Sequence, residues 1–239
     1  MFDKNLLEGK RILVTGGGSG LGKEMSRHFL TYGAEVIICG RRDEVLQKTA
    51  KELNDETKGK ITAHSLDIRD SLAIEETINN VFDEGPLDGL VNNAAGNFIS
   101  RTNDLSPNGF NAIASIVFHG TFNMTNTVGK KWIELKQPGT ILSITTTWVW
   151  TGSPFVVPSA MSKSGINAMT KSLAVEWGPH NIRLNCIAPG PFPTEGAWSR
   201  LSPDTEATEG AMDQSSMSSN PMGRAVSYTH LTLPTSVIV

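Results

Sequence analysis

The sequence predicts a three-layer α/β/α domain built on a doubly wound parallel sheet. Short apolar runs such as "RILVTG" (11–16), "AEVIICG" (34–40) and "GTILSIT" (139–145) alternate along the chain with segments of helical pattern. Alternating strands and helices indicate right-handed βαβ units, which produce a parallel sheet. A chain of 239 residues that is 38% hydrophobic can bury one core of this size.

The elements follow one another in a regular order. The run 11–16 ends in glycines, and an amphipathic helix is expected from Gly20; the run 34–40 is followed by a polar helical pattern over about 43–57. The segments "ITAHSLDI" (61–68), "LDGLVNNAAG" (87–96) and 139–145 repeat this strand-then-helix order. Parallel sheets bind ligands beyond the carboxyl ends of their strands. We therefore expect the site after Val14, Ile38, Leu66, Leu90 and Ile144.

The bulk composition excludes several classes of function. A net charge of −3 and a pI near 6.0 argue against nucleic acid as a partner, because phosphate backbones require a basic face. The sequence contains no apolar run of about 20 residues and begins without a secretory signal, so a cytoplasmic protein without a membrane partner is expected. Cys39 and Cys186 are expected to be free thiols, and no metal site is predicted.

The first strand–helix junction has the composition of a dinucleotide loop. Glycines permit a tight turn and let backbone amides approach a pyrophosphate at the start of a helix. A glycine-rich turn without a ligand is the alternative. The expected cofactor contacts in "TGGGSGLG" are Gly16, Gly17, Gly18, Ser19, Gly20, Leu21 and Gly22.

The end of the second strand indicates which nicotinamide cofactor is bound. An acidic residue there would hold the ribose 2′-hydroxyl of NAD. This chain has Gly40 followed by Arg41 and Arg42, and two guanidinium groups suit the 2′-phosphate of NADP. Two solvated arginines at the start of a helix are the alternative. We expect NADPH/NADP, with further contacts from Asp67 after the third strand and from Asn93 and Ala94 after the fourth.

Four motifs together resemble the short-chain dehydrogenase/reductase family: "TGGGSGLG", "NNAAG" (92–96), the lysine of "SAMSKSG" and "IAPGP" (187–191). The resemblance covers about residues 8–224. Within that family, "NNAAGNFIS", "SITTTWVWTGSPFVVPSAMSKSG" and "PGPFPTEGAWSRLSP" are similar to the 2,4-dienoyl-CoA reductases. This resemblance implies a Rossmann-type fold, NADPH-dependent reduction of a 2,4-dienoyl-CoA to an enoyl-CoA in the degradation of unsaturated fatty acids, and a homo-oligomer, either a dimer or a tetramer.

The resemblance also implies roles for individual residues. Lys163 and the segment Pro189, Gly190, Pro191 and Phe192 match further cofactor contacts. Arg69, Phe98, Ser106 and Arg200 match positions that contact the acyl-CoA. For Arg69 and Arg200, surface salt bridges are the alternative.

The catalytic segment lacks the tyrosine that most of this family places four residues before the lysine. Ser159 occupies that position, as it does in the dienoyl-CoA reductases, and Trp148 stands where their mitochondrial type has another tyrosine. An indole can donate a hydrogen bond but has no accessible pKa. Reduction of a dienoyl thioester requires donors to an enolate oxygen. Asn97, Ser159 and Trp148 are the candidates, and Lys163 would hold the nicotinamide ribose.

His119 departs from the asparagine usual in the family, on a helix that should face the lysine. It could hold a proton-relay water or act as an acid near neutral pH. A helix histidine bonded to a backbone carbonyl is the alternative.

The chain is expected to comprise one incomplete domain, 1–224, and a non-native tail, 225–239. The tail "AVSYTHLTLPTSVIV" fits the translation of a sequencing-library adapter, so the last helix and strand of the domain are expected to be missing. A natural divergent tail is the alternative. Two further functions stay open: a short-chain reductase of another acyl-CoA or carbonyl compound, and a non-catalytic NADP-binding homologue or fragment.

Overall fold

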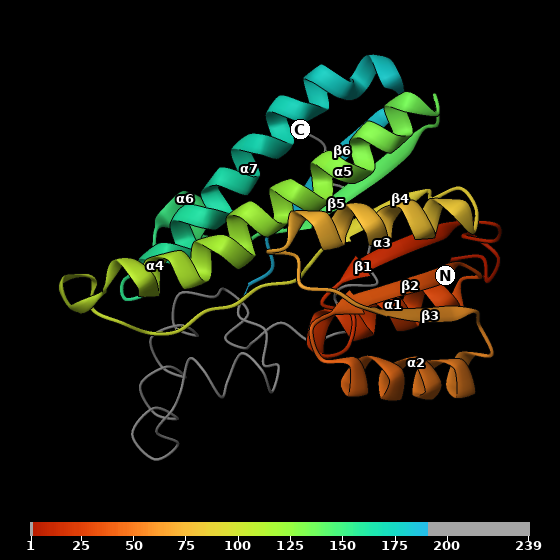
Figure 1. Ribbon diagram of the computed structural model, residues 1–239, viewed down its shortest axis with the longest axis horizontal. Helices are drawn as coiled ribbons and strands as arrows, with labels where there is room; N and C mark the ends of the chain where they lie inside the picture. The colour runs from red at the N-terminus through yellow and green to blue at the C-terminus, as the bar shows by residue number, and fades with distance from the viewer. Residues whose placement is uncertain (1, 191–239) are drawn as a thin grey trace.

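The computed structural model describes residues 2–190, which form a six-stranded parallel sheet between two layers of helices (Figure 1). The strands are β1 (Arg11–Thr15), β2 (Glu35–Gly40), β3 (Ile61–Ser65), β4 (Gly89–Asn92), β5 (Gly139–Ile144) and β6 (Ile182–Ile187). The helices are α1 (Gly20–Thr31), α2 (Asp43–Thr57), α3 (Ser71–Asp83), α4 (Pro107–Ala114), α5 (Thr121–Glu134), α6 (Trp148–Thr151) and α7 (Val157–Trp177). Short helical turns cover Thr102–Asp104, Ser115–Gly120 and Gly178–His180.

The strand order is β3-β2-β1-β4-β5-β6, so the direction of winding reverses between β1 and β4. Such a switch point opens a crevice at the carboxyl ends of the two central strands, where open α/β sheets bind ligands. The predicted Rossmann-type, doubly wound parallel sheet is confirmed over the described residues.

The two faces of the sheet are covered by different helices (Figure 1). On one face, Val14 and Ile38 pack with Leu30 of α1 and Leu53 of α2. On the other, alternate strand residues such as Leu13 pack with side chains of α3, α5 and α7, including Ile78, Trp132 and Trp177. The strands are therefore apolar on both faces, which is why they read as continuous apolar runs.

Side-chain caps begin α3 and α4 but not α1. Asp70 caps α3 by accepting hydrogen bonds from the backbone N–H groups of Leu72 (3.0 Å) and Ala73 (3.1 Å). Ser106 caps α4 by accepting from Gly109 N–H at 3.1 Å. The cap position of α1, Ser19, makes no side-chain capping bond, and the first turn of α1 has no acidic residue. Its N-terminal N–H groups are left for another partner.

A π-helical turn, Ser115–Gly120, joins α4 to α5. At its end the chain passes very close to the segment after β3: a Cβ built on Gly120 would lie 2.7 Å from the Ile68 side chain. Turns of this kind are rare and occur frequently near functional sites.

Arg11 links β1, β2 and the end of α3 at the amino-terminal ends of the strands. Its side chain, 10% exposed, donates to Glu35 (2.9 Å), to Glu84 (3.2 Å) and to the carbonyls of Val81 (2.9 Å) and Gly85 (2.6 Å). Burial alone would raise the pKa of Glu35, but hydrogen bonds from Lys60 and Arg11 outweigh burial and lower it. This network lies at the amino-terminal ends of the strands, opposite the ligand crevice at their carboxyl ends.

Both cysteines are free thiols, and burial raises the pKa of Cys39 to about 12. None of the helices within residues 2–190 combines the length and apolar character needed to cross a bilayer. That same part of the chain has no group of three or more His, Cys, Asp or Glu side chains suited to a metal ion. The expectations for Pro191, Phe192, Arg200, the boundary at 224, the tail and the missing last helix and strand lie outside the described residues.

Candidate functional site

The glycine loop after β1 is packed so closely that larger residues do not fit. Gly16 has φ +67° and Gly20 φ +54°, both in the left-handed region. A Cβ on Gly17 would lie 2.4 Å from Ile38, and one on Gly22 would lie 2.3 Å from the Gly16 carbonyl oxygen. The loop is thereby folded tightly over the ends of β1 and β2, at the open N-terminus of α1.

Asn93 and Thr15 fasten this loop to the end of β4. The Asn93 Nδ2 group donates to the carbonyls of Thr15 (3.0 Å) and Gly16 (3.3 Å). In return, the Thr15 hydroxyl accepts from the backbone N–H groups of Asn93 and Ala94, each at 3.0 Å. These four hydrogen bonds, with a fifth from the Thr15 hydroxyl to the Val91 carbonyl (3.3 Å), join the two sides of the crevice. Thr15 was not among the expected site residues; its place directly before the glycines is the signal that could have found it.

The loop and helix fit the pyrophosphate of a dinucleotide. The first turn of α1 presents uncapped N–H groups and the positive end of the helix dipole. The glycines leave room above the strand ends for a close approach by a ligand. The expected residues 16–22 therefore lie together in one cradle.

The ends of β2 and β3 place the expected nucleotide-selecting residues side by side. Gly40 and Leu66 are joined by an N–H···O bond of 2.8 Å, so Arg41 and Asp67 each stand one residue beyond it. Arg41 and Arg42 are exposed. The Arg69 guanidinium binds the Asp67 carboxylate and, as the main cause, lowers its pKa. Arg69, expected to contact the substrate, is thus bonded to an expected cofactor residue.

Lys163 and Ser159 lie one turn apart on the buried face of α7, with 7% and 5% of their surfaces exposed. The Lys163 Nζ donates a short hydrogen bond to the Ile144 carbonyl at the end of β5. Burial lowers the pKa of Lys163 from 10.5 to about 8. A buried amine held at the end of a central strand is a strong candidate for a functional cation. The sequence could not have indicated the Ile144 carbonyl as the acceptor, because every residue has a backbone carbonyl.

Asn97, Phe98 and Ser106 lie on the long connection that follows β4. The Asn97 Oδ1 accepts from the Phe98 N–H at 3.0 Å, and its amide N–H groups make no hydrogen bond to other described residues. The Phe98 ring packs against a small cluster containing Val117 and Ile166. Ser106 is exposed and caps α4, a structural role that "SPNG" indicates and that the expectation of a substrate contact did not include.

This connection is pinned to the segment before α7 by a strained residue. The Ser100 N–H donates to the Phe155 carbonyl at 2.9 Å. Phe155 has φ +65°, and its ring is 50% exposed. A left-handed conformation is a genuine outlier for a bulky residue. The Asn97 side of the site therefore depends on an unfavourable backbone conformation on the Ser159 side.

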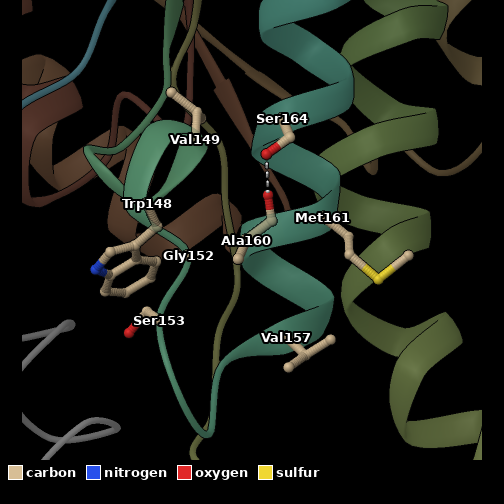
Figure 2. A pocket seen from close by; sticks show the side chains of 8 residues that line it. All are labelled: Trp148, Val149, Gly152, Ser153, Val157, Ala160, Met161 and Ser164. Atoms are coloured by element: carbon tan, nitrogen blue, oxygen red, sulfur yellow. Dashed lines mark hydrogen bonds between the residues drawn. The ribbon is translucent and has the colours of Figure 1, made fainter.

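Trp148 begins α6 and borders a shallow groove between α6 and one face of α7. Figure 2 shows its indole projecting away from α7, while Ala160 and Ser164 stand on the helix behind it. The groove is lined by Trp148, Val149, Gly152, Ser153, Val157, Ala160, Met161 and Ser164. Neither Ser159 nor Lys163 is among these residues, so the structure does not bring the indole into one cluster with them.

His119 lies in the π-helical turn and is exposed. Its ring meets that of Phe118 edge-on, with centroids 5.4 Å apart. The hydrogen bonds of the described residues do not connect it to Lys163. Pro189 and Gly190 lie two and three residues after the end of β6 and are half-buried.

A glycine cradle at the switch point of a parallel sheet defines a Rossmann-type nucleotide-binding protein. A buried lysine on the helix after β5 adds a cation to that site. The family model described as short chain dehydrogenase matches residues 10–204, and the chain belongs to this family.

Several relatives are reductases by name. A probable 2,4-dienoyl-CoA reductase 3, (3E)-enoyl-CoA-producing, of Caenorhabditis elegans is 46% identical over 198 residues, covering 82% of this chain and 64% of the relative. A probable 2,4-dienoyl-CoA reductase, (2E)-enoyl-CoA-producing, of Bacillus subtilis is 39% identical over 220 residues, covering 91% and 84%. The first curated relatives are matched over only 63–64% of their own length.

Solved structures agree with the fold. An actinorhodin polyketide ketoreductase crystallised with NADPH superposes with a TM-score of 0.84 at 30% identity. The alignment covers 93% of this chain and 87% of that protein.

Proposed function

We propose that this protein is an NADPH-dependent reductase of 2,4-dienoyl-CoA thioesters. In the overall reaction, NADPH gives a hydride to the diene and becomes NADP⁺, and one proton is added at carbon to give the enoyl-CoA. The single observation that carries the proposal is Ser159 in place of an acidic hydroxyl, one turn before the buried Lys163. A serine cannot protonate a carbonyl oxygen efficiently at neutral pH, but it can donate a hydrogen bond to an enolate.

The cofactor would lie across the switch point. The residues 16–22 and the start of α1 would hold its pyrophosphate, and Arg41 and Arg42 the 2′-phosphate. Asp67, Asn93, Ala94, Pro189 and Gly190 would supply further contacts to the cofactor. When bound, the nicotinamide supplies the hydride. The Lys163 ammonium would hold the nicotinamide ribose and add positive potential where the enolate forms.

The chain's own residues would then stabilise the developing negative charge. Asn97 and Ser159 are the two donors to the thioester oxygen, with the Trp148 N–H as a third candidate. Phe98 would contact the conjugated chain. His119, exposed on the π-helical turn, would hold the water that supplies the proton. We infer a homo-oligomer from the resemblance to the reductases, and we keep the cytoplasm, expected from the sequence, as the place of the reaction.

The test is NADPH oxidation by the purified chain with a 2,4-dienoyl-CoA and with simple ketones. Turnover of the dienoyl-CoA alone is expected. Replacement of Lys163 by Met should abolish it, whereas Lys171→Met, on the exposed face of the same helix, should not. Turnover of ketones but not of dienoyl-CoA would favour a carbonyl reductase. NADPH binding without turnover of any acyl-CoA would favour a non-catalytic protein.

Trp148→Phe tests the indole separately, because it removes the N–H and keeps an aromatic ring. Loss of a required oxyanion donor costs roughly a hundredfold in kcat. An unchanged kcat would leave Asn97 and Ser159 as the sufficient donors.

A further inference from the structure

Three arginines and one carboxylate gather at the ends of β2 and β3. Arg41 and Asp67 follow the Gly40–Leu66 hydrogen bond on adjacent strands, and the charge of Arg41 contributes to the lowered pKa of Asp67. Arg42 is the next residue. These groups carry a formal charge of +2, and which of the arginines Asp67 pairs with decides where the excess positive charge lies.

Asp67 is engaged almost entirely by Arg69. The Arg69 Nε lies 2.9 Å from both carboxylate oxygens and its Nη2 lies 2.5 Å from Oδ2. The Arg69 backbone N–H donates to Oδ1 at 3.0 Å. A guanidinium bound through Nε and Nη2 keeps its Nη1–Nη2 edge, but the carboxylate largely balances its charge while the pair is intact.

The pair determines what Arg41 can do. If Arg69 did not hold Asp67, that carboxylate would stand beside Arg41 as its nearest available acceptor. An arginine paired with a carboxylate binds a phosphate less well, because its donors and its charge are already used. With Arg69 in place, Arg41 has no side-chain hydrogen bond within the described part of the chain.

We infer that Arg69 is a positioning residue of the nucleotide site, which holds Asp67 and so keeps Arg41 and Arg42 available to the 2′-phosphate of NADPH. This rests on the proposed function, because it takes NADPH as the cofactor. It replaces the acyl-CoA contact that the resemblance implies for Arg69. Arg69 thereby contributes to the selection of NADPH over NADH without touching either.

The experiment measures dissociation constants for NADPH and NADH by calorimetry on the full chain without an acyl-CoA. Four proteins complete a cycle: wild type, Arg69→Gln, Asp67→Asn and the double variant. Arg69→Gln should weaken NADPH binding roughly three- to tenfold while changing NADH binding much less. In the Asp67→Asn background the same change should leave the ratio of the two constants unaltered. Arg183→Gln is the control, since Arg183 bonds Thr140 near the other edge of the sheet.

Two results would overturn the inference while the proposed function stands. One is an unchanged nucleotide ratio in Arg69→Gln accompanied by a raised KM for the dienoyl-CoA, which would assign Arg69 to the substrate. The other is that Arg69→Gln weakens NADPH binding as much in the Asp67→Asn background as in the wild type. Arg69 would then contact the phosphate directly. A wild-type chain that binds neither nucleotide would overturn the proposed function and the inference together. Arg69→Lys, which keeps the charge but not the fork, should give an intermediate ratio and guards against misfolding of the glutamine variant.

Discussion

Lys163 carries its charge at a cost to stability. A fall in pKa from 10.5 to about 8 corresponds to about 3 kcal/mol of unfavourable burial of the protonated amine. Below pH 8 the amine is protonated in the folded and the unfolded chain, and this cost is constant. Between pH 8 and 10.5 the unfolded chain binds more protons than the folded chain, so stability rises with pH.

Lys163→Met should therefore be more stable than the wild type at pH 7, by about 1–3 kcal/mol after loss of the Ile144 bond. The difference should shrink as the pH rises from 8 to 10.5. Urea unfolding at pH 7 and pH 10 measures both values. A difference that is constant across this range would mean that the amine is not desolvated.

Phe155 stores backbone strain between the two halves of the site. Its φ of +65° costs about 1 kcal/mol or more for any residue with a Cβ, and glycine avoids this cost. Phe155→Gly should consequently be more stable than Phe155→Ala by about 1 kcal/mol, the reverse of the usual order. Thermal unfolding of the two variants, which both lack the ring, isolates the backbone contribution. Equal stabilities would show that position 155 is unstrained.

At the residue scale, the side chains of the candidate site were easier to predict from the sequence than the contacts that they make. The glycines were expected from the backbone freedom that a tight loop needs, Asn93 from its place after the fourth strand, and Ser159 and Lys163 from the family resemblance. Three features could not be predicted from the sequence. They are the pairing of Arg69 with Asp67, the hydrogen bond from Lys163 to a backbone carbonyl, and the left-handed conformation of Phe155. These depend on distances and dihedral angles that a spacing in the sequence does not fix.

At the scale of elements, the glycine loop, α1 and the end of β4 form one unit through Asn93. A Cβ at position 22 would lie 2.3 Å from the Gly16 carbonyl oxygen and 2.6 Å from Asn93 Nδ2. Gly22→Ala should therefore destabilise the fold by about 2–3 kcal/mol and abolish NADPH binding.

Gly178→Ala is the matched control, because Gly178 has φ −51° and nothing within 4 Å of a Cβ. Its stability and NADPH affinity should stay close to those of the wild type. Chemical unfolding and calorimetric titration of both variants make the comparison. Tight NADPH binding by the alanine variant at position 22 would contradict the tight-cradle model of the loop.

The strands were predictable because their apolar runs end in glycine or in polar residues; 61–68 was expected and Ile61–Ser65 is observed. The π-helical turn was not predictable, since nothing in "SIVFHG" interrupts the helical pattern. A phase estimated from 3.6 residues per turn does not hold through this turn. His119, which the resemblance places on a helix facing the lysine, is exposed on this turn.

At the scale of the whole molecule, the Arg11 hydrogen-bond network and the candidate site lie at opposite ends of the parallel strands. The Arg11 network joins β1, β2 and the end of α3 at the amino-terminal edge. Arg11→Met should lower the free energy of unfolding by about 3–5 kcal/mol, because it leaves the Val81 and Gly85 carbonyls without this donor and Glu35 with Lys60 alone. NADPH affinity of the folded variant should not change.

As the control, Lys60→Met removes the exposed partner of Glu35 and should lower the free energy of unfolding by less than about 1 kcal/mol.

The lowered pKa of Glu35 stabilises the fold above pH 4.5, and this contribution is lost as the pH falls through the folded-state pKa. Arg11→Met should lose less stability than the wild type on acidification. Unfolding curves at pH 7 and pH 4 measure the difference, and equal acid losses would assign the ion pair no energetic role.

The π-helical turn also bears on how this chain can change length. A turn closed by i→i+5 hydrogen bonds contains about one residue more than an α-helical turn. A one-residue deletion within 115–120 can be absorbed by conversion to α-helix, with α4 and α5 keeping their packed faces. The same deletion inside α5 would rotate one part of that helix by about 100° relative to the other and expose Trp132 or Met124. Of the whole helical run from Pro107 to Glu134, this turn is the segment that tolerates the loss of a residue.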